Sequence, residues 1–262
     1  MNKNKTMSGN DNSIPWYLLV AYAVSLVAWW VVNRVAVPCL LYQPPGATYR
    51  GNQNPIIVDP RTGDDASSNP AIIFLHGNAC TADMMVPQAQ ILANRLHRRV
   101  YLLEYAGYGA LRNRARADNF SQLLDIAAEI YRNHGSSQVI MVGQSLGAYF
   151  ATRLAAVLPP QKLVLISPFY SIQLLAQDLV GLPDWLCKVA LYRNEFDTAK
   201  YLRQVAPNIH VQIIHGADDR LIPVRHAELL QKIHSAGAQL IIYPHQDHNG
   251  FDFQKIAQTI SE

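Results

Sequence analysis

A serine between two glycines lies at the junction of a strand-like run and a helix-like run of this sequence. The pentapeptide GQSLG, residues 143–147, follows the β-branched run QVIMV and precedes the helical stretch LGAYFATRLAAVL. A sharp strand-to-helix turn lifts a serine Oγ above a sheet, and N–H groups at a helix start favour developing negative charge. A serine hydroxyl is a weak nucleophile without a base. Ser145 is therefore a candidate nucleophile if a base and an orienting acid exist.

Acidic and imidazole side chains follow two later strand-like runs. Asp218 and Asp219 come after VQIIH, and His245 and His248 come after LIIY. The carboxyl ends of parallel strands share one edge of a sheet, where ligands of open α/β sheets bind. The order serine, acid, histidine predicts a Ser-Asp-His triad, with the choice within each pair left open.

An acyl-transfer mechanism also needs N–H donors for an oxyanion. The N–H of Leu146, directly after the candidate nucleophile, is the first expected donor. The second is expected in the loop of FLHGNAC, at Asn78 or at Ala79. His76 of this loop precedes the nucleophile in the chain, so bracing of the loop is favoured over a role as the base.

Short apolar strands alternate with amphipathic helices from residue 70 onward, and apolar residues on both strand faces are typical of a parallel sheet covered by helices. The repeated order predicts a doubly wound, mostly parallel α/β fold with right-handed crossovers. The interval between two strands at about 169–208 is longer than one crossover helix requires and predicts a small helical cap. The expected strands are 56–58, 71–75, 100–104, 138–142, 162–167, 211–215 and 240–243, and the expected helices are 81–98, 120–131, 146–158, 224–234 and 251–260.

An uncharged apolar segment runs from Ile14 to Val32, with tryptophans near both ends. Its 19 residues would span roughly 28 Å as a helix, which predicts one transmembrane anchor over about 14–37, after a tail over 1–13. A cleaved signal peptide or a buried core helix is less favoured, because no small-residue cleavage site follows. Flanking positive charges almost cancel, with a slight preference for the N-terminus inside and the domain, over 38–262, outside the cytoplasm.

Composition excludes several classes of protein. Half of the 262 residues are hydrophobic, and the net charge of +3 comes without a basic stripe or reader motif, so no nucleic-acid partner is expected. The three cysteines, Cys39, Cys80 and Cys187, match no metal template, and reduced thiols are the default expectation. We expect no metal, no organic cofactor and no obligatory protein partner.

The motifs LHGNA, GQSLGA, HGADDRLIP and HN occur in this order, and the chain resembles the α/β-hydrolase superfamily over roughly residues 38–258. More narrowly, LLYQPPG and LISPFYSI are similar to the membrane-anchored α/β-hydrolase-domain proteins, a group that includes protein depalmitoylases. The resemblance implies a nucleophile at Ser145, an acid at Asp219 and a base at His248. It implies oxyanion donors at the N–H groups of Asn78 and Leu146.

Two departures from that group concern the substrate. The turn that usually reads RGYGxS is AGYGAL here, with Ala106 in place of arginine, so substrate preference is expected to differ. The depalmitoylases rely on a lipidated, cysteine-rich N-terminus, whereas this chain has an apolar segment with only Cys39 nearby. Protein depalmitoylation is therefore disfavoured.

The combined pattern predicts a serine hydrolase of esters or thioesters, acting on lipidic or long-chain acyl substrates. A serine peptidase of the same fold is one alternative, although Ala148 stands where such peptidases often carry a glycine. A non-catalytic, membrane-anchored binding protein is the other alternative. A haloalkane-type dehalogenase is disfavoured, because it needs a carboxylate at the position of Ser145.

Overall fold

A seven-stranded sheet in the order β1-β3-β2-β4-β5-β6-β7 forms the centre of the protein. The computed structural model describes residues 15–31, 55–61, 70–111, 119–135, 138–181, 183–191, 196–234 and 236–262. Strands β2 to β7 run parallel, and β1 pairs antiparallel with β3 at one edge, which confirms the predicted, mostly parallel sheet. The strands are β1 (Ile56–Val58), β2 (Ala71–Leu75), β3 (Val100–Leu103), β4 (Val139–Gln144), β5 (Lys162–Ile166), β6 (His210–Gly216) and β7 (Gln239–Tyr243).

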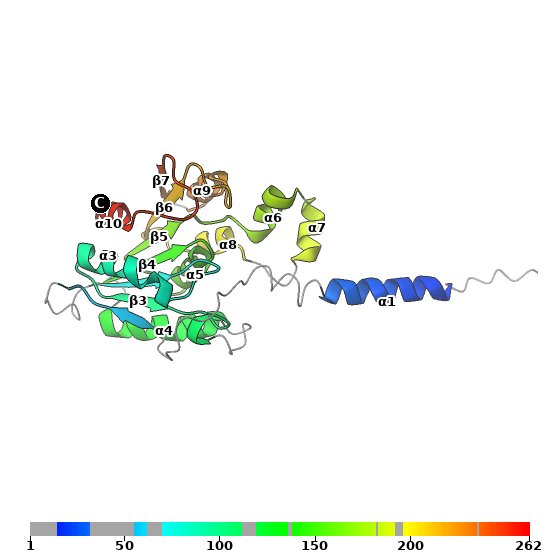
Figure 1. Ribbon diagram of the computed structural model, residues 1–262, viewed down its shortest axis with the longest axis horizontal. Coiled ribbons are helices and arrows are strands. Elements are labelled where there is room, and N and C mark those ends of the chain that lie inside the picture. Colours follow the sequence, from blue (N-terminus) through cyan, green and yellow to red (C-terminus); the bar gives the residue numbers. More distant parts are fainter. Residues whose placement is uncertain are drawn as a thin grey trace, which may run out of the picture.

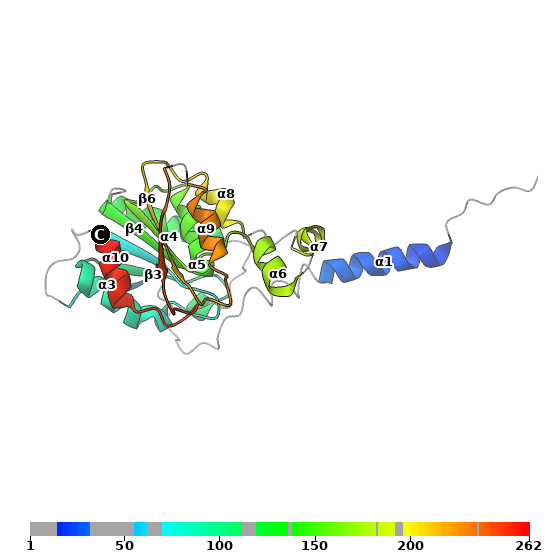
Figure 2. The same ribbon diagram turned by 90° about the horizontal axis from the view of Figure 1, so that it is seen from above.

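Helices cover both faces of the sheet, as the doubly wound prediction requires (Figures 1 and 2). Because side chains alternate across a strand, Ile72 and Phe74 of β2 enter one core and Ile73 and Leu75 enter the other. The first core lies under α3 (Val86–Leu96) and α10 (Phe253–Ser261), and the second under α4 (Asn119–His134), α5 (Leu146–Ala155), α8 (Thr198–Leu202) and α9 (Arg225–Gln231).

The helix expected over 81–98 is divided into two parts. A 3₁₀ turn, η2 (Asp83–Met85), precedes α3, which begins at Val86. Proline has no N–H to donate and is tolerated only in the first helical turn, so Pro87 fixes the start of the α-helix at this point. At the other end the chain leaves α3 through His97, whose φ is 51°.

The sequence predicts a cap between β5 and β6. The described residues of this interval form α6 (Ile172–Val180), α7 (Asp184–Ala190) and α8. The Oγ of Ser171 caps α6 by accepting the N–H of Leu174 at 3.2 Å, and Gly181 ends it with a φ of 69°. Figures 1 and 2 show α6 and α7 projecting from the sheet, whereas α8 packs beside α5. The domain boundaries themselves stay predictions.

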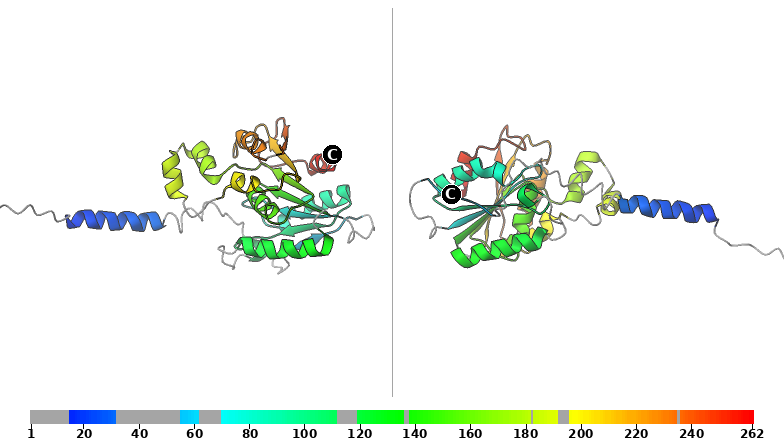
Figure 3. Two further views of the ribbon diagram at one scale, coloured as in Figure 1. Left: turned by 180° about the vertical axis from the view of Figure 1, so that it is seen from behind. Right: turned by 60° about the horizontal axis from the view of Figure 1, so that its bottom comes forward.

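The N-terminal helix α1 (Trp16–Val31) lies apart from the sheet (Figure 3). Its 16 residues rise about 24 Å, which is less than the roughly 30 Å of a bilayer core. Within the described residues, no helix is both long and apolar enough to span a membrane, so the structure does not support the predicted transmembrane anchor. Ile14, Val32 and Cys39 lie outside the described residues. The single-pass membrane location and its orientation stay predictions.

Candidate active site

The turn between β4 and α5 holds Ser145 in a strained conformation. Its φ of 53° and ψ of −115° are unusual for a residue with a side chain. The chain passes so closely here that a Cβ on Gly143 would lie 2.4 Å from the carbonyl oxygen of Gly147, and a Cβ on Gly147 would lie 2.1 Å from that of Leu75. The two glycines of the motif are therefore required by close backbone packing, and the turn presents the Ser145 hydroxyl at the carboxyl edge of the sheet.

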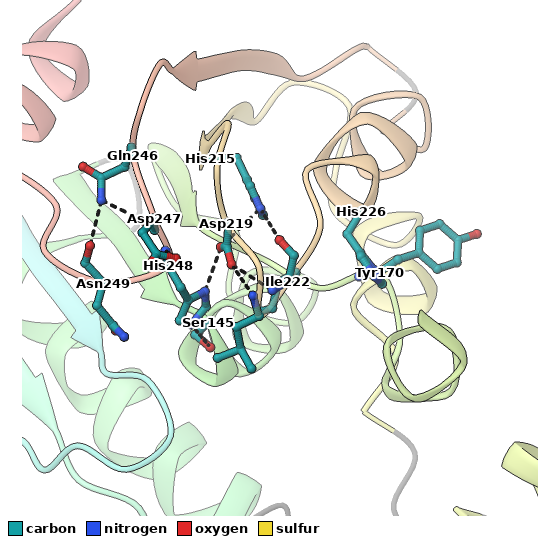
Figure 4. A network of polar contacts seen from close by, with 11 residues as sticks. Ser145, Tyr170, His215, Asp219, Ile222, His226, Gln246, Asp247, His248 and Asn249 are labelled. Carbon is teal, nitrogen blue, oxygen red and sulfur yellow. Dashed lines mark hydrogen bonds and ion pairs between the residues drawn. The ribbon is translucent and has the colours of Figure 1, made fainter. Parts of the chain in front are cut away.

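Ser145, His248 and Asp219 form a hydrogen-bonded chain at this edge (Figure 4). The Nε2 of His248 lies 3.1 Å from the Oγ of Ser145, and its Nδ1 lies 2.8 Å from the Oδ2 of Asp219. Asp219 is 5% exposed and His248 is 6% exposed, so both are shielded from water. Although 103 residues separate Ser145 from His248, the fold brings together all three side chains that the sequence singles out.

The loop after β6 holds the carboxylate of Asp219 in place. The Oδ1 of Asp219 accepts the N–H groups of Leu221 at 3.0 Å and Ile222 at 2.8 Å, which leaves Oδ2 for His248. Burial alone would raise the pKa of this carboxyl. The hydrogen bonds from His248 and from the Ile222 N–H outweigh burial and hold the pKa below its usual value. Asp219 is therefore ionised near neutral pH.

His215, near the end of β6, lies beside Asp219, and no sequence motif singles out this histidine. The side chain is fully buried, and its Nε2–H donates to the carbonyl of Ile222 at 2.8 Å. The same nitrogen lies 3.4 Å from the Oδ2 of Asp219. Burial lowers the pKa of His215, against the opposing effects of Ile222 and Asp219, so the ring is neutral. The neutral ring holds the loop that carries Asp219 in place and adds no charge beside the carboxylate.

The loop after β7 places His248 and not His245 at the site. The side-chain amide of Gln246 donates to the carbonyls of Asp247 at 2.8 Å and Asn249 at 2.7 Å, which closes the turn around His248 (Figure 4). His245 is 95% exposed and faces Asp218 at 3.7 Å on the surface. Strand order and spacing alone did not distinguish Asp218 from Asp219 or His245 from His248. In the structure, Asp219 and His248 lie at the site and the other two lie on the surface.

The two expected oxyanion donors lie beside Ser145. Leu146 is the first residue of α5, so its N–H has no acceptor within the helix. Leu146 and Asn78 line the same cavity as Ser145, and a Cβ on Gly77 would lie 3.4 Å from that of Ser145. The hydroxyl of Tyr108 donates to the Oδ1 of Asn78 at 2.6 Å and orients this loop. Ala79, the alternative donor, also lines the cavity.

A buried pair braces the loop that carries Asn78. The Nε2 of His76 lies 2.8 Å from the Oε1 of Glu104, and the two residues are 1% and 4% exposed. The other carboxylate oxygen of Glu104 accepts the N–H of Ala82 at 3.0 Å, and Tyr105 donates its hydroxyl to the His76 carbonyl at 2.7 Å. His76 is thus part of the scaffold of the loop, as expected. Its partner Glu104 directly follows β3 and carries no sequence signal of its own.

A cavity of about 820 Å³ opens at Ser145. Its volume lies within the range of small-molecule sites, and its walls are predominantly apolar. Cys80 also lines it, and burial raises the pKa of this thiol. In the described parts of the chain, no group of His, Cys, Asp and Glu residues is arranged to hold a metal ion. The apolar lining includes Met85, Phe169, Ile172, Leu175, Leu179, Leu191, Phe196, Leu221 and Phe251.

The sheet order, the serine turn and the hydrogen-bonded chain define an α/β-hydrolase-type fold and site. Residues 70–205 match the family model described as the alpha/beta hydrolase fold, and the chain belongs to this family.

Each relative found by sequence matches this chain over only part of its own length. An uncharacterized protein of Mycobacterium tuberculosis is 30% identical over 186 residues, which are 70% of this chain and 64% of that protein. The lysophosphatidylserine lipase ABHD12 of Danio rerio is 30% identical over 190 residues, which are 66% of this chain and 48% of that protein. The chain therefore spans less than two thirds of either relative.

A solved structure with the same fold is Est1E from Butyrivibrio proteoclasticus with bound ferulic acid. The TM-score is 0.62 at 16% identity, and the match covers 82% of this chain and 96% of that one. At this identity the likeness concerns the fold alone.

Proposed function

We propose that this protein is a serine hydrolase that cleaves carboxylic ester or thioester bonds through an acyl-enzyme. The observation that carries the proposal is the hydrogen-bonded chain from Ser145 through His248 to Asp219 at an apolar cavity. The family of the chain and its lipase relative support the same reaction class.

In the acylation half of the proposed reaction, the Oγ of Ser145 attacks the acyl carbonyl while the Nε2 of His248 accepts the hydroxyl proton. The ionised Asp219 holds the tautomer of His248 and stabilises the imidazolium. The carbonyl electron pair moves onto oxygen, where the N–H groups of Leu146 and Asn78 donate to it. As the tetrahedral intermediate collapses, the bond to the leaving group breaks and His248 returns the proton to that group.

Deacylation repeats these steps with water. His248 removes a proton from water, the hydroxide attacks the acyl-enzyme carbonyl, and the same two N–H groups stabilise the second oxyanion. The ester bond to Ser145 then breaks, and the imidazolium returns its proton to the serine oxygen. Free acid leaves and the resting site is restored. Apart from the substrate and the attacking water, each step uses side chains and backbone N–H groups of this chain.

We infer that the acyl part of the substrate is long and apolar. The cavity walls beyond Ser145 are built from aliphatic and aromatic side chains, which favour alkyl chains over polar groups. The relative from Danio rerio is named as a lipase, which agrees with such a substrate. Protein depalmitoylation remains disfavoured on the sequence grounds given above.

The test combines active-site labelling with a substrate series. A fluorophosphonate probe should label the wild-type protein and not the Ser145→Ala variant. Hydrolysis of p-nitrophenyl esters from acetate to palmitate, and of matched acyl-thioesters, should rise with chain length and be lost in Ser145→Ala. Full hydrolysis by pure Ser145→Ala would overturn the proposal.

The two alternatives predict other outcomes of the same experiment. A serine peptidase would be labelled but would cleave peptide substrates faster than esters. A non-catalytic binding protein would resist the probe in its folded form, because its serine would not be activated. An optimum at acetyl-length chains would keep the hydrolase and remove the long-chain substrate.

A further inference from the structure

Helix α6 forms one wall of the cavity beyond Ser145. Ile172, Leu175, Ala176 and Leu179 line the cavity at the spacing of one helical face. This wall comes from the projecting part of the fold, not from the sheet (Figure 2). The distance of α6 from the body of the protein therefore sets the width of the cavity.

Asp178 of α6 connects this helix to α9, which packs on the sheet. Asp178 is 14% exposed in its side chain and faces α9. Its Oδ2 accepts the Nε–H of Arg225 at 2.6 Å, and its Oδ1 accepts the Nη2–H of the same guanidinium. The Nε2 of His226 lies 3.0 Å from Oδ2. A two-pronged Arg contact and a buried imidazole together hold one carboxylate, which is a strong and directional arrangement.

His226 ties the start of the same helix to the body. It is fully buried, and its Nδ1 accepts the backbone N–H of Tyr170 at 3.1 Å, two residues before α6 (Figure 4). Nδ1 is thus an acceptor, so Nε2 carries the hydrogen that is donated to Asp178. Burial lowers the pKa of His226 against the opposing effect of Asp178, and the positive Arg225 and the nearby His215 act in the same direction as burial. A neutral ring makes both contacts.

The two ends of α6 are held by different bonds. At its start, the Ile172 N–H donates to the Phe196 carbonyl at 2.8 Å, in addition to the contact between Tyr170 and His226. In its second half, Asp178 makes the polar contact with the body, whereas Gln177 bonds Asp184 of the projecting α7 at 2.9 Å. Loss of the Asp178 contact would therefore release the second half of the wall and leave its start attached.

We propose that Asp178 is a positioning residue whose contacts with Arg225 and His226 fix the α6 wall and thereby select the acyl chain length. The proposal rests on the hydrolase function proposed above. Leu179 and Val180, in the second half of α6, line the same cavity as Ser145, and we expect a short acyl group held at Ser145 to end before it reaches them. A long acyl chain reaches the second half of α6, and the affinity for this chain depends on how close α6 lies to the opposite wall of the cavity.

The test compares Asp178→Asn with Glu228→Gln, an equal carboxylate-to-amide change at an exposed position of α9. We expect Asp178→Asn to lower kcat/KM for p-nitrophenyl decanoate about tenfold through KM, with the acetate ester unchanged within about twofold. The control should change neither ester. Equal losses on both esters would indicate a general structural role, and an unchanged ratio would show that the wall does not depend on Asp178. Either result overturns the proposal.

A second variant and a binding readout keep the test decisive. If Asp178→Asn does not fold, Arg225→Gln removes only the half-exposed partner and should shift the same ester ratio in the same direction. In a Ser145→Ala background, the fluorescence of cis-parinaric acid measures chain binding without catalysis. Asp178→Asn should weaken its Kd about tenfold, and an unchanged Kd would overturn the proposal. Absence of all ester and thioester hydrolysis would refute the proposed function, while this binding assay would still decide the role of Asp178.

Discussion

At the scale of single residues, the environment and not the residue type distinguishes Asp219 from its neighbour Asp218. Both are aspartates in one loop. Asp219 accepts two backbone N–H groups and faces His248, whereas the side chain of Asp218 is 61% exposed and lies near the surface residue His245. A buried carboxylate with these donors is held ionised and oriented. The two residues should therefore differ strongly in their effect on catalysis.

We expect Asp219→Asn to lower kcat for a p-nitrophenyl ester about a thousandfold or more, because an amide would no longer hold the reactive tautomer of His248. The matched change Asp218→Asn should leave kcat within about twofold. Steady-state kinetics on both variants, with circular dichroism to verify folding, provide the measurement. A large loss in Asp218→Asn with an active Asp219→Asn would reverse the assignment.

At the scale of elements, the sharp turn between β4 and α5 depends on close backbone approach. A Cβ on Gly147 would lie 2.1 Å from the Leu75 carbonyl and 2.6 Å from that of His76, which is backbone that cannot turn aside. Packing of α5 against β2 therefore needs a glycine at this position. At Gly237, whose φ is 80°, no described atom lies within 4 Å of an added Cβ, so this position needs glycine for its backbone conformation.

Gly147→Ala should lower the free energy of unfolding by about 3 kcal/mol and slow fluorophosphonate labelling of Ser145, because α5 and β2 must separate. Gly237→Ala should cost about 1 kcal/mol and leave labelling unchanged. Urea unfolding and labelling rates measure the two effects. Equal costs for the two changes would contradict the role of close packing.

The contact between α6 and α9 also has a pH signature. The pKa of His226 in the folded protein lies below its unfolded value of about 6.5, so the unfolded chain binds more protons. The stability from the neutral ring is full above that unfolded pKa and is lost as pH falls through the folded pKa. The slope is at most about 1.4 kcal/mol per pH unit.

His226→Gln should flatten the pH dependence of unfolding between pH 7 and pH 5. A glutamine offers one acceptor for Tyr170 and one donor for Asp178 but does not titrate. The buried His215 is present in both proteins, and its contribution cancels in the difference. Parallel curves for wild type and His226→Gln would contradict the prediction.

At the scale of the whole molecule, the sheet, its covering helices and the projecting helices α6 and α7 supply the folded core and the candidate site. Helix α1 has no buried residue, and its indole contact from Trp29 to the Val189 carbonyl, at 3.2 Å, is on the surface. Neither hydrophobic core includes a residue of α1. Removal of the N-terminal segment should therefore leave the hydrolase domain intact.

A chain that begins at residue 38 should have the same urea midpoint as the full chain and the same kcat for p-nitrophenyl acetate within about twofold. The physical reason is that the side chains of α1 are exposed, so their deletion removes little buried apolar area. A lower midpoint, or a lost acetate activity, would show that the domain extends into the segment before residue 38. Wild-type full-length protein, purified in parallel, is the control.

The sequence by itself determined the repeating elements and the serine turn. The period of apolar residues is a local property, so the order of strands and helices and the glycines around Ser145 could be predicted. So could the loops with Asp218, Asp219, His245 and His248. The predicted ends of helices were less accurate than their existence. The helix expected from residue 81 begins as an α-helix only at Val86, because Pro87 must lie in its first turn.

Only the tertiary structure shows that these groups meet. The strand order brings β4, β6 and β7 to one edge, and the hydrogen bonds of Ile222 and Gln246 hold the loops that place Asp219 and His248, the pair implied by the family resemblance, beside Ser145. The contact between Asp178 and His226 joins residues 48 positions apart. Such contacts depend on the packing of distant segments, which no local period or spacing encodes.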